Sequence, residues 1–453
     1  MMRRFYATAI LLTALIAAPA IVPTFAGTSA SGNIVYLASP PRYFVSSDAG
    51  ALPPGNVCNV GSFDLHCYTP AVMQKAYNFV GAYRLVGGYA NAGAGETIVI
   101  IDAYGSPTIR HDLSVFDGAF GIPAANLNII CPQGCPAFNP ASANEIGWSF
   151  ETTLDVEYAH AMAPAATIDL VVASTNYGSA INNAEQYALD NHLGQVWSQS
   201  FGAPECAFAG DNSQFVQSQS IYRQAASSGV TLIASAGDTG AQEGCPSPSA
   251  LYPSSSPYSL AVGGTHLNVG ANGAYKSETT WNDLEDGYLL NQGVTLPLAT
   301  GGAPSVFFSL PSWQTGLYAT PYACQSGPCS AGSPAPLGMR TTSDVSYNAD
   351  LDGGVIGYWS AVASYAGFYI FGGTSAGSPQ WAAVIAIADQ LSGSPLGYVN
   401  QQLYALAGTN GFHDVTVGSN TLAPGTGYLA TPGYDPPTGL GSPNVGVLVQ
   451  ELS

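Results

Sequence analysis

The sequence predicts an α/β fold, in which a parallel sheet carries helices on both of its faces. Between residues 96 and 235, short runs rich in Val, Ile and Leu alternate with longer segments of helical character. This alternation is typical of doubly wound parallel sheets. The 453 residues are 47% apolar, which is enough for a substantial core. No linker of low complexity divides the chain, so we expect a single large domain.

The expected elements follow one another closely. A helix is predicted from Thr69, a suitable N-cap, through Tyr77, because Pro70 is favoured in a first turn. The predicted strands cover residues 96–101, 127–130, 167–173, 195–200 and 230–235, with shorter strands at 258–262 and 367–371. The predicted helices cover residues 112–120, 145–161, 179–191 and 214–228. In such a sheet, functional side chains gather at the carboxyl ends of the strands.

Residues 1–26 have the features of a secretory signal peptide. Arg3 and Arg4 precede an apolar run over residues 5–21, and small residues follow where cleavage would occur. An uncleaved membrane anchor is the less favoured alternative, since prolines interrupt the run. We therefore expect a secreted protein.

Charge and cysteine content narrow the possible functions. The chain has 9 Lys and Arg against 28 Asp and Glu, which leaves almost nothing to bind phosphates and argues against nucleic acid as a partner. So few basic groups also mean little charge repulsion once acid neutralises the carboxylates. The eight cysteines, six of them in close pairs, indicate disulfides in an exported chain, although their connectivity stays open.

A Gly-Gly-Thr-Ser turn at residues 372–375 opens an Ala-rich apolar helix. A hydroxyl at a helix N-terminus lies near unpaired N–H groups and the positive end of the macrodipole, where a developing negative charge is stabilised. Ser375 is therefore a candidate nucleophile. The alternative is that Thr374 or Ser375 serves only as an N-cap.

Two acidic residues lie four positions apart on the predicted helix at 145–161. Glu151 and Asp155 share one face of this helix, and their neighbours are apolar. Two close carboxylates in a poor dielectric share a proton, so the pair can take a proton from a hydroxyl and return it to a leaving amine. The alternative is an exposed acidic face.

A third acidic residue, Asp238, follows a predicted strand in the turn Gly-Asp-Thr-Gly. A protonated Asp in this turn can donate a hydrogen bond to an oxyanion, although Asp is also common in ordinary turns. The six histidines lack a context that supports a Ser-His-Asp triad, and only His160, on the helix of Glu151, remains a candidate base.

Taken in order, these motifs resemble the sedolisin family of serine-carboxyl peptidases from about Tyr68 to Ser453. The resemblance rests on the segments 99–107, 151–155, 198–202, 235–238, 252–265 and 373–379. It implies a subtilisin-like fold and an acid-active endopeptidase, with a tripeptidyl-peptidase as the alternative. It also implies Ser375 as nucleophile, Glu151 as general base, Asp155 as the residue that orients Glu151, and Asp238 as the oxyanion-hole donor. We expect a peptidase domain at 69–453 after an N-terminal extension at 27–68.

The tail resembles the calcium site of the same family. By this resemblance the ligands of Ca2+ come from Asp414, Val415, Thr431, Gly433 and Asp435. Two carboxylates and carbonyls turned inward suit calcium, which takes six or more oxygen ligands. The family usually has Gly where Thr431 stands, and Thr tolerates fewer backbone angles.

Other expectations concern partners and competing functions. Protein or peptide substrates and a monomeric state are expected. Many family members carry a long N-terminal propeptide, whereas only residues 27–68 separate the predicted signal from the expected catalytic region. We therefore expect either that the enzyme folds without a long propeptide or that a separate inhibitory polypeptide supplies it. A non-catalytic binding protein on the same scaffold is the main competing function. A two-carboxylate glycosidase is disfavoured because it leaves the Gly-Thr-Ser turn without a role.

Overall fold

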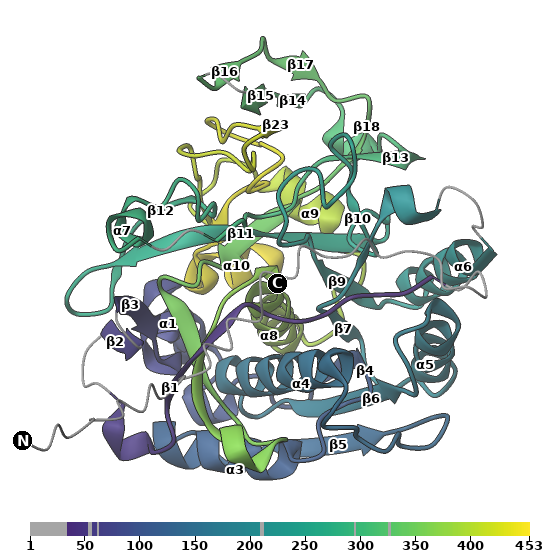
Figure 1. Ribbon diagram of the computed structural model, residues 1–453. Helices are drawn as coiled ribbons and strands as arrows, with labels where there is room; N and C mark the ends of the chain where they lie inside the picture. Colours follow the sequence, from purple (N-terminus) through teal and green to yellow (C-terminus); the bar gives the residue numbers. More distant parts are fainter. Residues whose placement is uncertain (1–33, 53–56, 61–62, 209–212, 294–295, 325–327) are drawn as a thin grey trace, which may run out of the picture.

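The computed structural model describes residues 34–52, 57–60, 63–208, 213–293, 296–324 and 328–453 (Figure 1). The predicted signal peptide at 1–26 lies outside these residues, as do residues 27–33 of the predicted extension. No helix within the described parts of the chain is both long and apolar enough to cross a membrane.

An eight-stranded sheet forms the centre of the molecule, with strand order β12-β11-β9-β7-β4-β6-β5 and β19 beside β11. All neighbouring strands are parallel except β12, which is antiparallel to β11. This confirms the predicted α/β fold with its mainly parallel sheet. The strands are β4 (Thr97–Ala103), β5 (Asn126–Ile130), β6 (Thr167–Ala173), β7 (Val196–Gln199), β9 (Thr231–Ser235), β11 (Ser259–Val269), β12 (Tyr275–Thr280) and β19 (Val345–Asn348).

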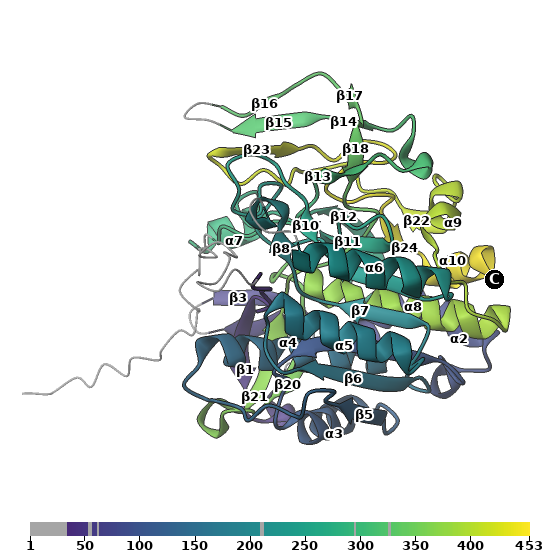
Figure 2. The ribbon, with the colours of Figure 1, turned by 90° about the vertical axis from the view of Figure 1, so that its right-hand side faces the viewer.

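Helices cover both faces of this sheet (Figure 2). Successive residues of β4 point to opposite faces, so Ile98 and Ile100 pack in one hydrophobic cluster while Val99 and Ile101 pack in another. Continuous apolar strands follow from this two-sided burial. The helices that cover the first face are α1 (Pro70–Ala76), α2 (Phe79–Leu85), α3 (Ile109–Phe120), α4 (Ala143–Met162), α8 (Gly377–Ser392) and α10 (Val445–Leu452), and those on the second face are α5 (Gly178–Asp190) and α6 (Ser213–Ser227).

Strand β11 is longer than predicted. The sequence indicated a strand ending at residue 262, where Gly263 and Gly264 follow, but β11 continues to Val269. The reason is tertiary packing: a Cβ on Gly264 would lie 2.8 Å from the Trp281 ring, and one on Gly263 would lie 2.4 Å from the Ser343 hydroxyl. These glycines allow close approach rather than ending the strand.

A second sheet of five strands lies beside α4, in the order β1-β21-β20-β3-β2. Only β21 in this sheet was predicted. Three of its strands come from residues 42–68 and two from residues 354–371, so their pairing has no local sequence signal. They are β1 (Arg42–Ser46), β2 (Val57–Val60), β3 (Phe63–Tyr68), β20 (Gly354–Trp359) and β21 (Gly367–Phe371).

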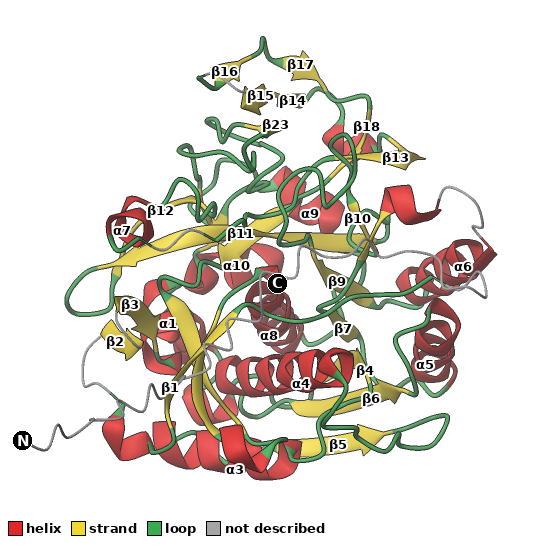
Figure 3. Ribbon diagram, in the orientation of Figure 1, coloured by secondary structure: helices red, strands yellow, loops and turns green. Residues whose placement is uncertain are grey.

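Loops and short strands make up the part of the molecule above the main sheet, as expected for the loop-rich segments after residue 236 (Figure 3). Four disulfides join Cys58 to Cys67, Cys131 to Cys135, Cys206 to Cys245, and Cys324 to Cys329. The predicted disulfides are therefore present, and each joins cysteines that are neighbours in sequence order.

Candidate active site

The turn that carries Ser375 connects β21 to α8. It contains a short 3-10 helix (Thr374–Ala376), so α8 begins at Gly377, two residues later than the sequence suggested. Gly373 has φ +91°, and a Cβ there would lie 2.6 Å from Asp238 Oδ2. Only glycine fits this position. Ser375 is 6% exposed and lies two residues before the N-terminal end of α8, where unpaired backbone N–H groups gather.

Asp238 follows β9 and is held against this turn. Its Oδ1 accepts hydrogen bonds from the backbone N–H and the hydroxyl of Thr374, both at 2.8 Å. Oδ2 is the oxygen that faces Gly373. Burial raises the pKa of Asp238, and the hydrogen bonds from Thr374 oppose that rise. A raised pKa favours the protonated form, in which Oδ2 can carry a hydrogen to donate.

Glu151 and Asp155 are fully buried on α4, which corrects the alternative of an exposed acidic face. Burial, followed by the charges of Asp155 and Asp102, raises the pKa of Glu151 well above its ordinary value, and hydrogen bonding by the Ser375 hydroxyl opposes the rise. Neither oxygen of Glu151 has a hydrogen-bond partner of normal geometry among the described residues, so the oxygens are free to accept a proton from the Ser375 hydroxyl. The carboxylates and the hydroxyl thus meet in one buried cluster.

Asp155 is fixed by a residue of the main sheet. The Ser200 hydroxyl, which follows β7, donates to Asp155 Oδ1 at 2.7 Å and lies 3.4 Å from the carbonyl oxygen of Ser375. Burial, followed by the charge of Asp102, raises the pKa of Asp155. Ser200 therefore links the Asp155 carboxyl to the turn of Ser375.

Asp102 is a member of this cluster to which the sequence analysis assigned no role. It lies at the carboxyl end of β4, is fully buried, and burial raises its pKa to about 7. The signal that could have identified it is a carboxylate at the end of a buried apolar strand. Three carboxyls in contact through their charges hold fewer than three negative charges near neutral pH, because burial and mutual repulsion both favour protonation.

His160 takes no part in the cluster. Its Nε2 donates to the carbonyl oxygen of Pro123 at 2.8 Å and lies 3.4 Å from Asp117. These partners belong to the region around α3, so the structure gives no support to a Ser-His-Asp arrangement.

The described start of the chain crosses the site. Leu37 and Gly202 exchange two backbone hydrogen bonds, of 3.0 and 3.1 Å, in an antiparallel bridge. Further along, the Gly372 N–H donates to the Pro41 carbonyl at 2.9 Å, and the Arg42 guanidinium lies 3.9 Å from the centre of the Phe150 ring. An extended segment of the chain itself therefore lies along the edge next to Ser200 and ends beside the Ser375 turn.

The residues compared above with a calcium site also meet in space. Asp414 Oδ2 accepts from the Gly433 N–H, and Asp435 Oδ2 from the Thr431 N–H, each at 2.9 Å. Burial, opposed by hydrogen bonds and reinforced by the charge of Asp414, raises the pKa of Asp435 to about 8. Two neighbouring carboxylates, one fully buried, fit a cation that would relieve their repulsion. Val415 lies beside Asp414, and Thr431 has no positive φ, so its side chain brings no backbone strain there.

No family model matches the chain. The chain is nevertheless similar to individual peptidases over most of its length. It is 34% identical to kumamolisin from Bacillus sp. (strain MN-32) over 392 residues, which cover 85% of this chain and 63% of kumamolisin. It is 29% identical to sedolisin from Pseudomonas sp. (strain 101), covering 79% and 58% of the two chains, and 28% identical to mouse (Mus musculus) tripeptidyl-peptidase 1, covering 87% and 66%. The chain thus spans about three fifths of the length of these relatives.

A solved structure of one of these relatives has a similar fold. Pseudomonas sedolisin, described as a serine-carboxyl proteinase complexed with two molecules of pseudo-iodotyrostatin, superimposes with a TM-score of 0.69 and 27% identity. The match covers 85% of this chain and 98% of that one.

Proposed function

The chain belongs to the sedolisin family, and on that basis we propose that it is a serine-carboxyl peptidase that hydrolyses peptide bonds through an acyl-enzyme on Ser375. The observation that carries the proposal is the buried cluster in which the Ser375 hydroxyl faces Glu151, Asp155 lies beside Glu151, and Asp238 lies against the same turn. A binding protein would have no need to keep such a costly group of buried acids.

In this mechanism Glu151 accepts the proton of the Ser375 hydroxyl as the oxygen attacks the substrate carbonyl, and then returns it to the leaving amine. Asp155, held by Ser200, orients Glu151 and shares the pair's proton. Asp238 Oδ1 is occupied by Thr374, so a proton on Oδ2 is available for the oxyanion. The oxyanion contact needs a proton on Asp238, and acid pH supplies that proton. We therefore propose an acid-active enzyme.

The substrate is proposed to be an extended peptide on the edge next to Ser200. Support comes from residues 34–41, which lie there as an added strand and pair with Gly202. An open edge that accepts internal segments favours an endopeptidase. For a substrate to bind, this segment must move away or be removed, which gives residues 34–41 an inhibitory role.

Secretion and calcium binding complete the proposal. Four disulfides are typical of an oxidising, extracellular environment. Asp414, Asp435 and the carbonyl groups of Val415, Thr431 and Gly433 would hold the calcium ion, which would stabilise the loops without taking part in the chemistry.

The decisive experiment measures hydrolysis of a denatured protein between pH 2 and 7 by the full chain and by Ser375→Ala and Glu151→Gln. We expect activity confined to acid pH and reduced by at least about 10³-fold in both variants. Ser394→Ala, a change of an exposed serine just beyond α8, is the matched control and should retain full activity. Mass spectrometry of the products distinguishes internal cleavage from release of tripeptides.

Folded wild type that cleaves nothing over this range, even after residues 1–41 have been removed, would reject the peptidase proposal in favour of a binding protein. Full activity of the folded Ser375→Ala variant would reject the acyl-enzyme mechanism.

A further inference from the structure

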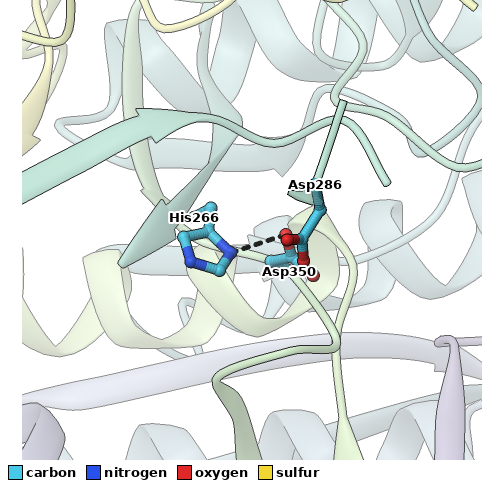
Figure 4. A group of neighbouring side chains, drawn as sticks. All are labelled: His266, Asp286 and Asp350. Carbon is cyan, nitrogen blue, oxygen red and sulfur yellow. Dashed lines mark hydrogen bonds and ion pairs between the residues drawn. The ribbon is translucent and has the colours of Figure 1, made fainter. Parts of the chain in front are cut away.

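A second group of metal-ligating side chains lies outside the site described above (Figure 4). It comprises His266 on β11, Asp286 before α7 (Gly287–Asn291), and Asp350 in the loop after β19. Each offers one ligand atom, and these atoms all lie within 4.8 Å of one another. His266 Nδ1 is 2.8 Å from Asp350 Oδ2. The three side chains line a cavity of about 240 Å³, which leaves room for water.

A buried carboxyl group, that of Asp283, lies beside Asp350 of the same group. Asp283 is fully buried; its Oδ1 accepts from the Trp281 indole N–H at 2.6 Å, while its Oδ2 has no hydrogen-bond donor among the described residues. Burial, followed by the charge of Asp350, raises the pKa of Asp283; the charge of Asp286 and a hydrogen bond shared with Asp350 add to the rise, and the Trp281 hydrogen bond opposes it. One oxygen of Asp286 also lacks a donor. Unsatisfied buried oxygens of this kind require a ligand or cost free energy.

The charge of the group is not balanced. Three carboxyls face one imidazole, and none of the ion pairs among the described residues joins a Lys or Arg to them. A cation would therefore gain from several negative groups at once. The imidazole selects the kind of cation, because calcium and magnesium take oxygen ligands whereas mixed nitrogen and carboxylate sites suit zinc and its neighbours.

We propose that His266, Asp286 and Asp350 bind a zinc ion, with Asp283 positioned to support Asp350 or to replace a water ligand. Zinc lies about 2.0–2.2 Å from such ligands in a tetrahedral arrangement, so two ligand atoms are about 3.4 Å apart. The ligand atoms now lie within 4.8 Å of one another, so binding requires a contraction of up to about 1.4 Å, which a change of the Asp286 rotamer next to α7 can supply. Water in the cavity completes the coordination.

The ion would join segments that also hold the active-site turns. Asp350 follows Ala349, whose carbonyl oxygen accepts the N–H of Gly373 at 2.6 Å. The Asp283 N–H donates to the carbonyl oxygen of Leu298, and the Ala299 N–H donates to the carbonyl oxygen of Asp238 at 3.1 Å. The ligand Asp350 is therefore one residue from a contact to the Ser375 turn, whereas Asp283 reaches the Asp238 turn through residues 298 and 299. Zinc binding would stabilise both turns. The inference does not depend on the proposed peptidase function, since zinc binding is measured without any hydrolysis.

The competing explanation is a simple ion pair. Burial lowers the pKa of His266, but the charge and hydrogen bond of Asp350 outweigh it and raise the pKa to about 9. A proton on Nδ1 therefore competes with the metal, and zinc binding must release it. This competition makes the two explanations experimentally distinct.

The test uses the full chain carrying Ser375→Ala, which prevents self-cleavage, with calcium in excess to occupy the calcium loops. Zinc content is measured after equilibrium dialysis against zinc near neutral pH, for this protein and for His266→Asn, Asp286→Asn and His192→Asn. His192 is exposed, so its substitution is the matched control. We expect one more zinc ion per chain in the parent and the His192→Asn protein than in His266→Asn, and at least tenfold weaker binding by Asp286→Asn.

Cobalt loaded in place of zinc should give absorption bands that require His266, which a structural role alone would not produce. Equal zinc content in the parent and His266→Asn proteins overturns the proposal, as does a parent that binds no zinc and shows only a proton on His266. If His266→Asn does not fold, as judged by circular dichroism, Asp286→Asn, a change in a partly exposed loop that keeps the cap of α7, decides the question.

Discussion

Glu243 allows a quantitative test of how the active-site turns depend on pH. This residue is 7% exposed, has φ +47°, and accepts a hydrogen bond from the Thr239 hydroxyl at 2.7 Å. A Cβ on Gly237 would lie 2.1 Å from its Oε1, so the carboxyl packs directly against the backbone next to Asp238. Burial raises the pKa of Glu243 from its ordinary 4.5 to about 8.

The sign follows from proton binding. Between pH 4.5 and 8 the unfolded chain has lost the proton of Glu243 whereas the folded protein keeps it, so stability falls as pH rises through this window. The rise of the pKa from 4.5 to about 8 corresponds to a loss of about 5 kcal/mol in the free energy of unfolding at pH 8. This value is an upper limit because the turn can relax. The Glu243→Gln variant is neutral at every pH and keeps a residue with a long side chain at the same positive φ. It therefore removes only the pH-dependent part of the free energy of unfolding.

Urea unfolding of Glu243→Gln and its parent, both with Ser375→Ala, measures the effect at pH 4, 6 and 8. We expect the free energy of unfolding of the variant to rise relative to the parent by about 2–5 kcal/mol between pH 4 and 8. Glu451→Gln, at an exposed position, should show no such change. A difference between Glu243→Gln and parent that is constant with pH would refute the reasoning, because Glu243 would then be ionised in the folded protein.

Three further predictions concern the turn, the N-terminal segment and the calcium loops. Gly373→Ala should lower kcat by about 10²-fold or more, because its Cβ would lie 2.6 Å from Asp238 Oδ2, the oxygen proposed to donate to the oxyanion. Gly393→Ala also has positive φ but meets no atom within 4 Å, so it should cost only about 1 kcal/mol in urea unfolding and leave kcat unchanged. Equal kcat in the two variants would contradict this. Leu37→Pro removes the N–H that donates to Gly202, so KM for a peptide substrate should fall several-fold with kcat unchanged; an unaltered KM would mean that the segment does not compete with substrate. Calcium withdrawal with EGTA should lower the Tm of the parent by several degrees but not that of Asp435→Asn, and differential scanning calorimetry would disprove the site if both proteins responded alike.

The sequence was sufficient where the signal is local. Apolar runs such as residues 96–101 predicted the strands of the main sheet, and the helix of Glu151 followed from its own periodicity. The turn of Ser375 was visible because glycines and a hydroxyl precede a helix. The motif order then indicated the family. These features depend on backbone propensity and on spacing along a few residues, which any sequence displays directly.

The tertiary structure decided what depends on distant segments. The second sheet pairs Arg42 with Phe371, and no local pattern specifies that partnership. Asp102 joins Glu151 and Asp155 only because β4 ends beneath α4, and their pKa values rise through burial that the sequence does not display. His266 and Asp350 are 84 residues apart, yet folding brings them to hydrogen-bonding distance. Proximity and desolvation are properties of the packed chain, so the chemistry of these groups is set by the fold rather than by their order in the sequence.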